Sequence, residues 1–161
     1  MNLISKLILK NKFIVLGHRG CPQIYLENTM PSFLKALEKK NWQGIEIDVQ
    51  LSKDNKVIIF HDENLKRLGN TNLNISDLNY NEIKNINLKD NHKIPLLTDL
   101  LQNYPKDKII NIEIKKYASS KIGIEKNIVL LVKKYNLYEQ CIISSFYPQI
   151  IRKVKKLDSK I

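Results

Sequence analysis

Five short apolar runs, each ending beside polar residues, constrain the fold of this 161-residue chain more than any other feature. The segments between them place apolar residues at helical spacing, and such alternation is typical of an α/β domain. We expect five strands, over residues 13–16, 44–51, 57–60, 109–114 and 141–144. Polar groups gathered where strands end are characteristic of a TIM-type (β/α) barrel, whose complete form has eight strands and typically about 250 residues. The chain is therefore predicted to be a single domain, 1–161, that holds about five of the eight strands of such a barrel.

Helical patterns separate these strands. Helices are expected over residues 29–39, 95–103, 123–135 and 147–157. Asn28 is placed to cap the first of them. The segment 63–93 is long, polar and rich in asparagine, and connections of this length are usually functional or mobile. We expect it to be an inserted subregion over the site, with one short helix where Asn79 and Glu82 form a capping box.

The net charge and the cysteine content indicate which binding partners and which cellular compartment suit the chain. The net charge of +11 suits an anionic partner such as nucleic acid, anionic lipid or a phosphate ester. Lysine is spread along the whole chain, however, so the bias equally fits a solvated surface. The sequence holds no aromatic and basic recognition motif, so we expect no specific nucleic-acid partner. Cys21 and Cys141 have no metal-type or redox-type spacing and suggest no disulfide framework, which favours a reducing, cytoplasmic location.

The N-terminal segment, residues 1–16, is apolar only in patches that Lys6, Lys10 and Lys12 interrupt. A membrane span needs a run of about 18 or more apolar residues, which this segment lacks. It also lacks the small-residue cleavage site of a secretory signal. We therefore expect a short helix that leads into the first strand, and no transmembrane segment.

Polar residues cluster first at His18 and Arg19, which lie between two glycines directly after the first apolar run. A histidine can move a proton near neutral pH, and an arginine has the fork geometry that binds phosphate oxygens. Glu27, Asn28 and Thr29 then stand at the expected start of a helix, where backbone N–H groups can bind phosphate. Taken alone, these clusters equally fit a loop histidine, a surface arginine and simple helix capping.

Glu46 and Asp48 form the third cluster, within the second expected strand. Alternate residues of a strand share a face, so both carboxylates point one way while the isoleucines between and around them point the other. Two carboxylates on an inward face are unfavourable unless they are paired or bind a metal, and hard cations such as Mg²⁺ or Ca²⁺ prefer oxygen ligands. The alternative is a strand edge that faces solvent.

The last two clusters are at His61 and at Glu113 with Lys115. A two-residue hairpin loop at Asp54 and Asn55 would place residues whose numbers sum to 109 opposite each other and so pair His61 with Asp48, beside the carboxylates. Strands joined by a hairpin are antiparallel, which conflicts with a barrel in which every strand is parallel. Parallel strands would also bring these strand ends together at one rim, so the sequence leaves both arrangements open. Glu113 offers a third carboxylate, and Lys115 on the same face could neutralise a phosphate or form a structural ion pair.

The order of these clusters resembles the glycerophosphodiester phosphodiesterase family: His-Arg-Gly, Glu-Asn-Thr, Glu-x-Asp, a Lys-Asp turn, His-Asp and Glu-x-Lys. The resemblance extends from about residue 13 to residue 145 and includes the Ser-Ser-Phe ending of the last strand. It implies a barrel fold, a divalent metal ion (Mg²⁺ or Ca²⁺), and hydrolysis of small glycerophosphodiesters to an alcohol and glycerol 3-phosphate, in lipid and glycerol metabolism.

The resemblance also implies a role for each matching residue. The acid–base pair would be His18 and His61, the metal ligands Glu46, Asp48 and Glu113, and the substrate- or phosphate-binding residues Arg19, Glu27, Asn28 and Lys115. Two departures of this sequence from the family pattern leave alternative functions open. Residues 65–71 match the family only loosely, so the alcohol is not predicted, and the family would supply further strands after Ile161. The chain could thus be an inactive relative that binds only an anion or metal, a half barrel completed by self-association or a partner chain, or a lysophospholipase D-like or phospholipase C-like enzyme.

Overall fold

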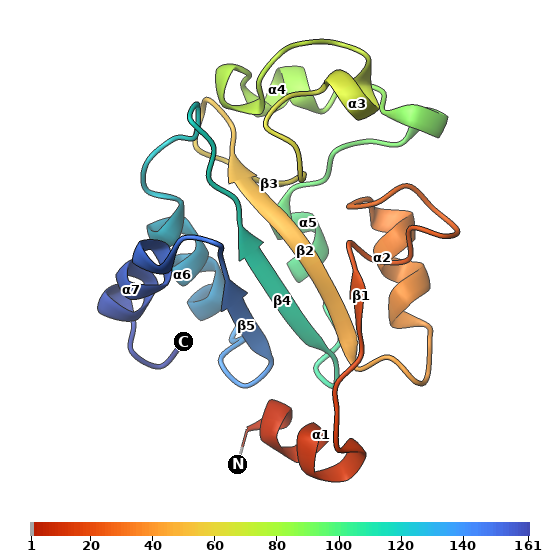
Figure 1. The fold of residues 1–161 in the computed structure, drawn as a ribbon, viewed down its shortest axis with the longest axis vertical. Coiled ribbons are helices and arrows are strands. Elements are labelled where there is room, and N and C mark those ends of the chain that lie inside the picture. Colours follow the sequence, from red (N-terminus) through yellow and green to blue (C-terminus); the bar gives the residue numbers. More distant parts are fainter. Residues whose placement is uncertain (1) are drawn as a thin grey trace.

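The computed structural model describes residues 2–161, and all five expected strands form a single sheet (Figure 1). The strands are β1 (Leu16–His18), β2 (Gly44–Leu51), β3 (Val57–Ile59), β4 (Ile109–Ile114) and β5 (Cys141–Ser144). Four of them run parallel in the order β1-β2-β4-β5, while β3 pairs antiparallel with β2 and lies off this path. The predicted bounds of β2, β4 and β5 are confirmed, and β3 is one residue shorter than expected. The prediction for β1 is displaced, because the strand covers residues 16–18 instead of 13–16.

The β2–β3 connection is a hairpin, but its register differs from the expected one. The numbers of paired residues sum to 108 rather than 109, because a three-residue turn over 53–55 replaces the two-residue loop. Its last residue, Asn55, takes a left-handed φ of 61°, which is typical of three-residue hairpin turns. The Phe60 N–H therefore donates to the Asp48 carbonyl (3.0 Å), and His61 lies one residue beyond instead of opposite Asp48.

Five longer helices surround the sheet: α1 (Leu3–Asn11), α2 (Met30–Leu37), α5 (Leu97–Leu101), α6 (Ile124–Lys134) and α7 (Pro148–Leu157). The expected N-terminal helix is present as α1. Within residues 2–161, no helix has both the length and the apolar content that crossing a bilayer requires. The prediction that Asn28 caps α2 is wrong, because Thr29 holds the cap position and Asn28 takes a left-handed φ of 55°.

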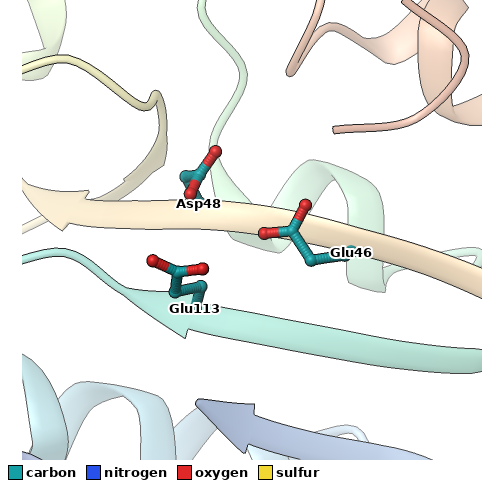
Figure 2. Close-up of side chains that lie close together, drawn as sticks. All are labelled: Glu46, Asp48 and Glu113. Carbon is teal, nitrogen blue, oxygen red and sulfur yellow. The ribbon is translucent and has the colours of Figure 1, made fainter. Parts of the chain in front are cut away.

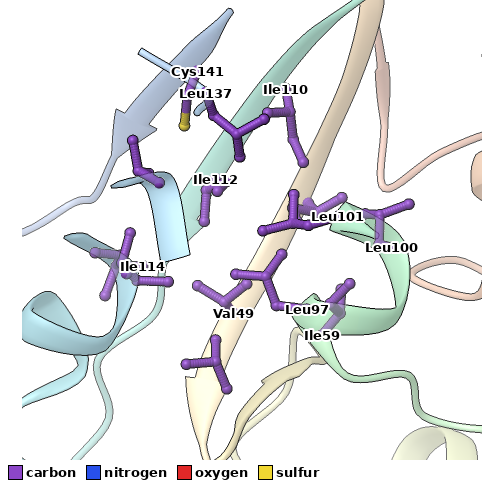
Figure 3. Close-up of a cluster of buried hydrophobic side chains, with 14 of the residues drawn as sticks. Val49, Ile59, Leu97, Leu100, Leu101, Ile110, Ile112, Ile114, Leu137 and Cys141 are labelled. Atoms are coloured by element: carbon purple, nitrogen blue, oxygen red, sulfur yellow. The ribbon is translucent and has the colours of Figure 1, made fainter. Parts of the chain in front are cut away.

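One face of the sheet is apolar and packs beneath helices (Figure 3). The residues of β2 and β4 on this face are Ile45, Ile47, Val49, Ile110, Ile112 and Ile114, all of them buried. They form one core with apolar side chains of α2, α5, α6 and α7. Because side chains alternate along a strand, Glu46, Asp48, Asn111 and Glu113 lie on the opposite face, which we call the polar face.

The segment 63–93 packs around a small apolar cluster that it shares with β3 and the residues next to it. It contains α3 (Lys66–Gly69), η1 (Ile75–Asp77), α4 (Tyr80–Ile83) and η2 (Lys89–Asn91), so it is more helical than the single helix expected. The Asn79 N–H donates to the Glu82 carboxylate (2.8 Å) at the start of α4, as the capping box predicts. Its apolar cluster comprises Ile58, Phe60, Leu65, Leu68, Ile75, Leu78, Ile83, Leu88 and Ile94.

Gly44 offers a direct test of the register between β2 and β4. A Cβ at this position would lie 1.8 Å from the carbonyl oxygen of Ile109, a backbone atom that cannot move without shifting β4. We expect Gly44→Ala to lower the free energy of unfolding by about 3 kcal/mol or more, the upper range for overpacking. Gly69→Ala is the matched control, because its Cβ would meet only side chains, at 3.2 Å or more. Equal urea midpoints for the two variants would contradict the close approach of β2 and β4 at Gly44.

Candidate active site

Three carboxylates meet on the polar face, where the middle of β2 lies beside the carboxyl end of β4 (Figure 2). The parallel register pairs Asp48 with Glu113, and Glu46 lies two residues earlier on β2. One oxygen of each residue lies within 4.8 Å of the others, and we call this trio the acidic cluster. The structure therefore brings together the three residues that the sequence suggested as metal ligands.

Glu46 and Asp48 are buried and Glu113 is partly buried, and the electrostatics of the acidic cluster favour a cation. Burial and then the negative charges of Asp48 and Glu113 raise the pKa of Glu46 to about 7, against the hydrogen bond that the Arg19 N–H donates to it (2.9 Å). Among residues 2–161, Glu46 Oε1 is a buried oxygen with no hydrogen-bond partner. A buried carboxylate oxygen that lacks a partner, next to two further carboxylates, fits a hard divalent cation.

Two cationic side chains and an amide contact the acidic cluster at Asp48, which is almost fully buried. Arg19 Nε lies 3.2 Å from Asp48 Oδ2, and Lys115 Nζ lies 3.5 Å from Asp48 Oδ1 and 2.8 Å from Glu113 Oε1. Asn28 Nδ2 donates to Asp48 Oδ2 (2.8 Å), and the Asp48 N–H donates to Asn28 Oδ1 (3.3 Å). Asn28 thus holds a carboxylate in place, a contact between residues twenty positions apart that no local pattern indicates.

The loop between β1 and α2 adopts a backbone that suits these contacts. Arg19 and Asn28 both have left-handed φ values, 56° and 55°, and the Asn28 N–H donates to the Arg19 carbonyl (3.0 Å). Positive φ is uncommon outside glycine, and it persists where surrounding contacts fix the conformation. Arg19 Nη1 also donates to Glu27 Oε1 (3.0 Å), so Glu27 orients the arginine beside the acidic cluster.

The two histidines lie at the end of, or just after, different strands and differ in how firmly they are held. His18 ends β1, its side chain is 70% exposed, and its Nε2 lies 3.9 Å from Glu46 Oε2. His61 follows β3, and its Nδ1 lies 2.7 Å from Asp62 Oδ1. Because the Asp62 carboxylate is an acceptor, Nδ1 carries the proton in this contact and Nε2 is left free to exchange one.

Two residues near the site were not found by sequence reasoning. Arg67, from α3, donates through Nε to Asp62 Oδ2 (2.6 Å) and through Nη2 to Glu27 Oε1 (2.5 Å). Tyr117, from the loop after β4, donates its hydroxyl hydrogen to the His61 carbonyl, and burial raises its pKa above the usual range. Neither belongs to a cluster of polar residues at a strand end, which is the signal that identified the other site residues.

Comparisons with known proteins show the family to which the chain belongs. A sequence profile of the glycerophosphoryl diester phosphodiesterase family matches residues 18–161. A glycerophosphodiester phosphodiesterase of Caldanaerobacter subterraneus is 37% identical over 154 residues, which cover 91% of this chain and 63% of that protein. Human lysophospholipase D is 35% identical over 160 residues, covering 91% of this chain and 49% of that protein. The chain therefore spans about half to about two thirds of the length of these relatives.

Solved structures of the same family have a similar fold over part of their length. The glycerophosphodiester phosphodiesterase of Thermotoga maritima matches with a TM-score of 0.74 at 41% identity, covering 89% of this chain and 58% of that one. A protein of Galdieria sulphuraria matches with a TM-score of 0.81 at 26% identity, covering 92% of this chain and 62% of that one. The predicted partial barrel is confirmed as an α/β sheet that matches these TIM barrels over part of their length, with the refinement that β3 is antiparallel. With its acidic cluster on the polar face of the sheet and a family profile that matches almost its whole length, the chain belongs to the glycerophosphoryl diester phosphodiesterase family.

Proposed function

We propose that the chain hydrolyses glycerophosphodiesters to an alcohol and glycerol 3-phosphate with the help of a divalent metal ion. The observation that carries the proposal is the acidic cluster, with its unpartnered buried oxygen on Glu46. His18 Nε2 lies 3.9 Å from Glu46, and His61 lines a pocket together with Glu113. Membership of the family supports the substrate class. The test is to incubate the chain with glycerophosphodiesters and Mg²⁺ or Ca²⁺ and to measure glycerol 3-phosphate.

Glu46, Asp48 and Glu113 would hold the ion through carboxylate oxygens. Such an ion supplies polarisation of a phosphoryl oxygen and offsets the charge that develops on it. Arg19 and Lys115 lie beside the same carboxylates and present cationic groups that can bind the remaining phosphoryl oxygens. With an ion held by the carboxylates, Arg19 and Lys115 would be available to contact the phosphate.

The two histidines would carry the proton transfers. One removes a proton from the attacking hydroxyl, either water or the substrate's own glycerol hydroxyl, as the new phosphorus–oxygen bond forms. The other donates a proton to the leaving oxygen as the bond from phosphorus to the alcohol breaks. His61 is suited to either step because Asp62 fixes the proton on Nδ1 and leaves Nε2 available.

A related substrate class is favoured by one comparison. The human relative that is 35% identical to this chain is named a lysophospholipase D, so lysophospholipids are a second candidate substrate class. The acidic cluster and histidines would serve either substrate, because both present a phosphodiester. Turnover of a lysophospholipid that exceeds turnover of the deacylated glycerophosphodiester would favour this second function.

Replacement of the histidines tests the proton-transfer roles. We expect His18→Ala and His61→Ala each to lower kcat about 10²- to 10⁴-fold, the usual contribution of a positioned acid or base, while the ion still binds. His92→Ala is the matched control, because His92 follows η2 and contacts the ring of Tyr25 rather than the acidic cluster. Unchanged rates in the first two variants would refute the assignment. A wild-type chain that binds the ion but releases no product would instead support a binding role.

Ion binding itself can be measured without turnover. We expect Mg²⁺ or Ca²⁺ to raise the melting temperature of the chain, because a ligand that binds only the folded state stabilises it by mass action. The shift should disappear in Asp48→Asn, which removes a buried ligand charge. Glu139→Gln removes one exposed carboxylate just before β5, distant from the strand ends that carry the site, and should retain the shift. Equal shifts in both variants would show that the ion binds elsewhere.

The raised pKa of Glu46 predicts a pH dependence of stability in the absence of metal. The folded state binds this proton more tightly than the unfolded state, so the free energy of unfolding falls as the pH rises from about 4.5, the ordinary glutamate value, to about 7. The loss should reach at most about 3 kcal/mol and should be absent in Glu46→Gln. Urea midpoints of the two proteins across this pH range measure the difference. A gap that stays constant with pH would contradict the raised pKa.

A further inference from the structure

We propose that Arg67 is a positioning residue that sets the proton-bearing nitrogen of His61 and, through a second carboxylate, the orientation of Arg19. Its guanidinium group lies between Asp62, which follows β3, and Glu27, in the loop after β1. The kinetic part of the inference rests on the proposed function, whereas the contacts and their spectroscopic consequence do not.

The first contact of Arg67 acts on His61. Arg67 donates through Nε to Asp62 Oδ2 (2.6 Å) and through Nη2 to Asp62 Oδ1 (3.0 Å), so both carboxylate oxygens are held by one planar group. Burial of Asp62 is outweighed by these bonds and by the contact with His61, and the pKa of the carboxyl lies below its usual value. An ionised and immobile Asp62 can only accept a hydrogen bond, so His61 Nδ1 must donate (2.7 Å).

The second contact of Arg67 acts on the opposite loop. Glu27 Oε1 accepts from Arg67 Nη2 (2.5 Å) and from Arg19 Nη1 (3.0 Å), so one oxygen joins two guanidinium groups. These charges lower the pKa of Glu27 against the opposing effect of its burial. Because Arg19 Nε lies 3.2 Å from Asp48, the chain of contacts extends from α3 to the acidic cluster. Arg67 thus connects Asp62, five residues before it in the sequence, with Glu27, forty residues before it.

The geometry requires an arginine rather than any cation. Nε and Nη2 lie in one plane and reach two carboxylates in different directions at once, whereas an ammonium group is a point charge without this fork. Arg67→Lys would therefore keep the charge and much of the length of the side chain but lose the simultaneous contacts. If Arg67 only anchored α3 to the rest of the chain, its replacement would not change which nitrogen of His61 carries the proton.

Nitrogen-15 NMR of the histidine rings tests the inference without metal or substrate. At a pH where the rings are neutral, we expect the wild-type chain to carry the His61 proton on Nδ1. In Arg67→Ala and Arg67→Lys, His61 should become a mixture of both tautomers, and Asp62→Asn should shift it towards Nε2–H, because the amide can donate to Nδ1. His18 and His92 serve as internal references, and Lys66→Ala, a neighbouring exposed lysine on α3, is the control variant.

Kinetics provide the second readout. If the chain is active, Arg67→Lys should lower kcat about 10- to 100-fold, the usual effect of a residue that orients a functional group, with a smaller change in KM. Loss of thermal stability with an unchanged His61 tautomer would overturn the inference and leave Arg67 a structural anchor. A wild-type His61 with its proton on Nε2 would overturn it as well. An inactive wild-type chain would count against the proposed function, while the NMR result would still decide the role of Arg67.

Discussion

Holding three carboxylates together in a buried place is the constraint on which the rest of this structure depends. Glu46, Asp48 and Glu113 repel one another, and no single contact keeps their oxygens within 4.8 Å. The backbone does so, because the parallel register of β2 and β4 fixes Asp48 beside Glu113, and Gly44 allows the two strands their close approach. Arg19, Lys115 and Asn28 then compensate charge that the sheet geometry would otherwise leave unpaired.

The sheet can carry this concentration of charge because one of its faces is apolar and packed beneath helices, while the other holds the charged side chains. The apolar face packs against α2, α5, α6 and α7 and supplies the stabilisation from burial, about 25 cal/mol for each Å² of apolar surface removed from water. The polar face carries the charged side chains, which pair with one another across neighbouring strands. The acidic cluster and both histidines come from β1, β2, β4 and the residues directly after β3, so their geometry is set by neighbouring strands within the part shared with the family.

Sequence reasoning succeeded where function follows from alternation along one strand. The period of two placed Glu46 and Asp48 on one face, and the apolar run 109–114 located Glu113 near the end of β4. It failed where a contact depends on tertiary structure. The left-handed turn residue Asn55 shifted the hairpin register by one, and Asn28 bonds to Asp48 instead of capping α2. Arg67 carried no local signal, because its partners are brought to it by loops distant in sequence.

A proton and the proposed divalent cation would compete for the carboxylate of Glu46. With a pKa raised to about 7, Glu46 retains a proton over much of the range in which an ordinary glutamate is ionised, so the proton acts as a counter-ion for the acidic cluster. A divalent ion that binds here must displace it, since only the ionised carboxylate is a full ligand. His18 Nε2 lies 3.9 Å from Glu46, so this histidine is placed to respond to that change in charge. His61 is held by Asp62 instead, through Nδ1 (2.7 Å). Binding of the proposed ion would therefore change the charge near His18 and leave the Asp62 contact of His61 in place, and such unequal environments are what opposite proton-transfer roles would require.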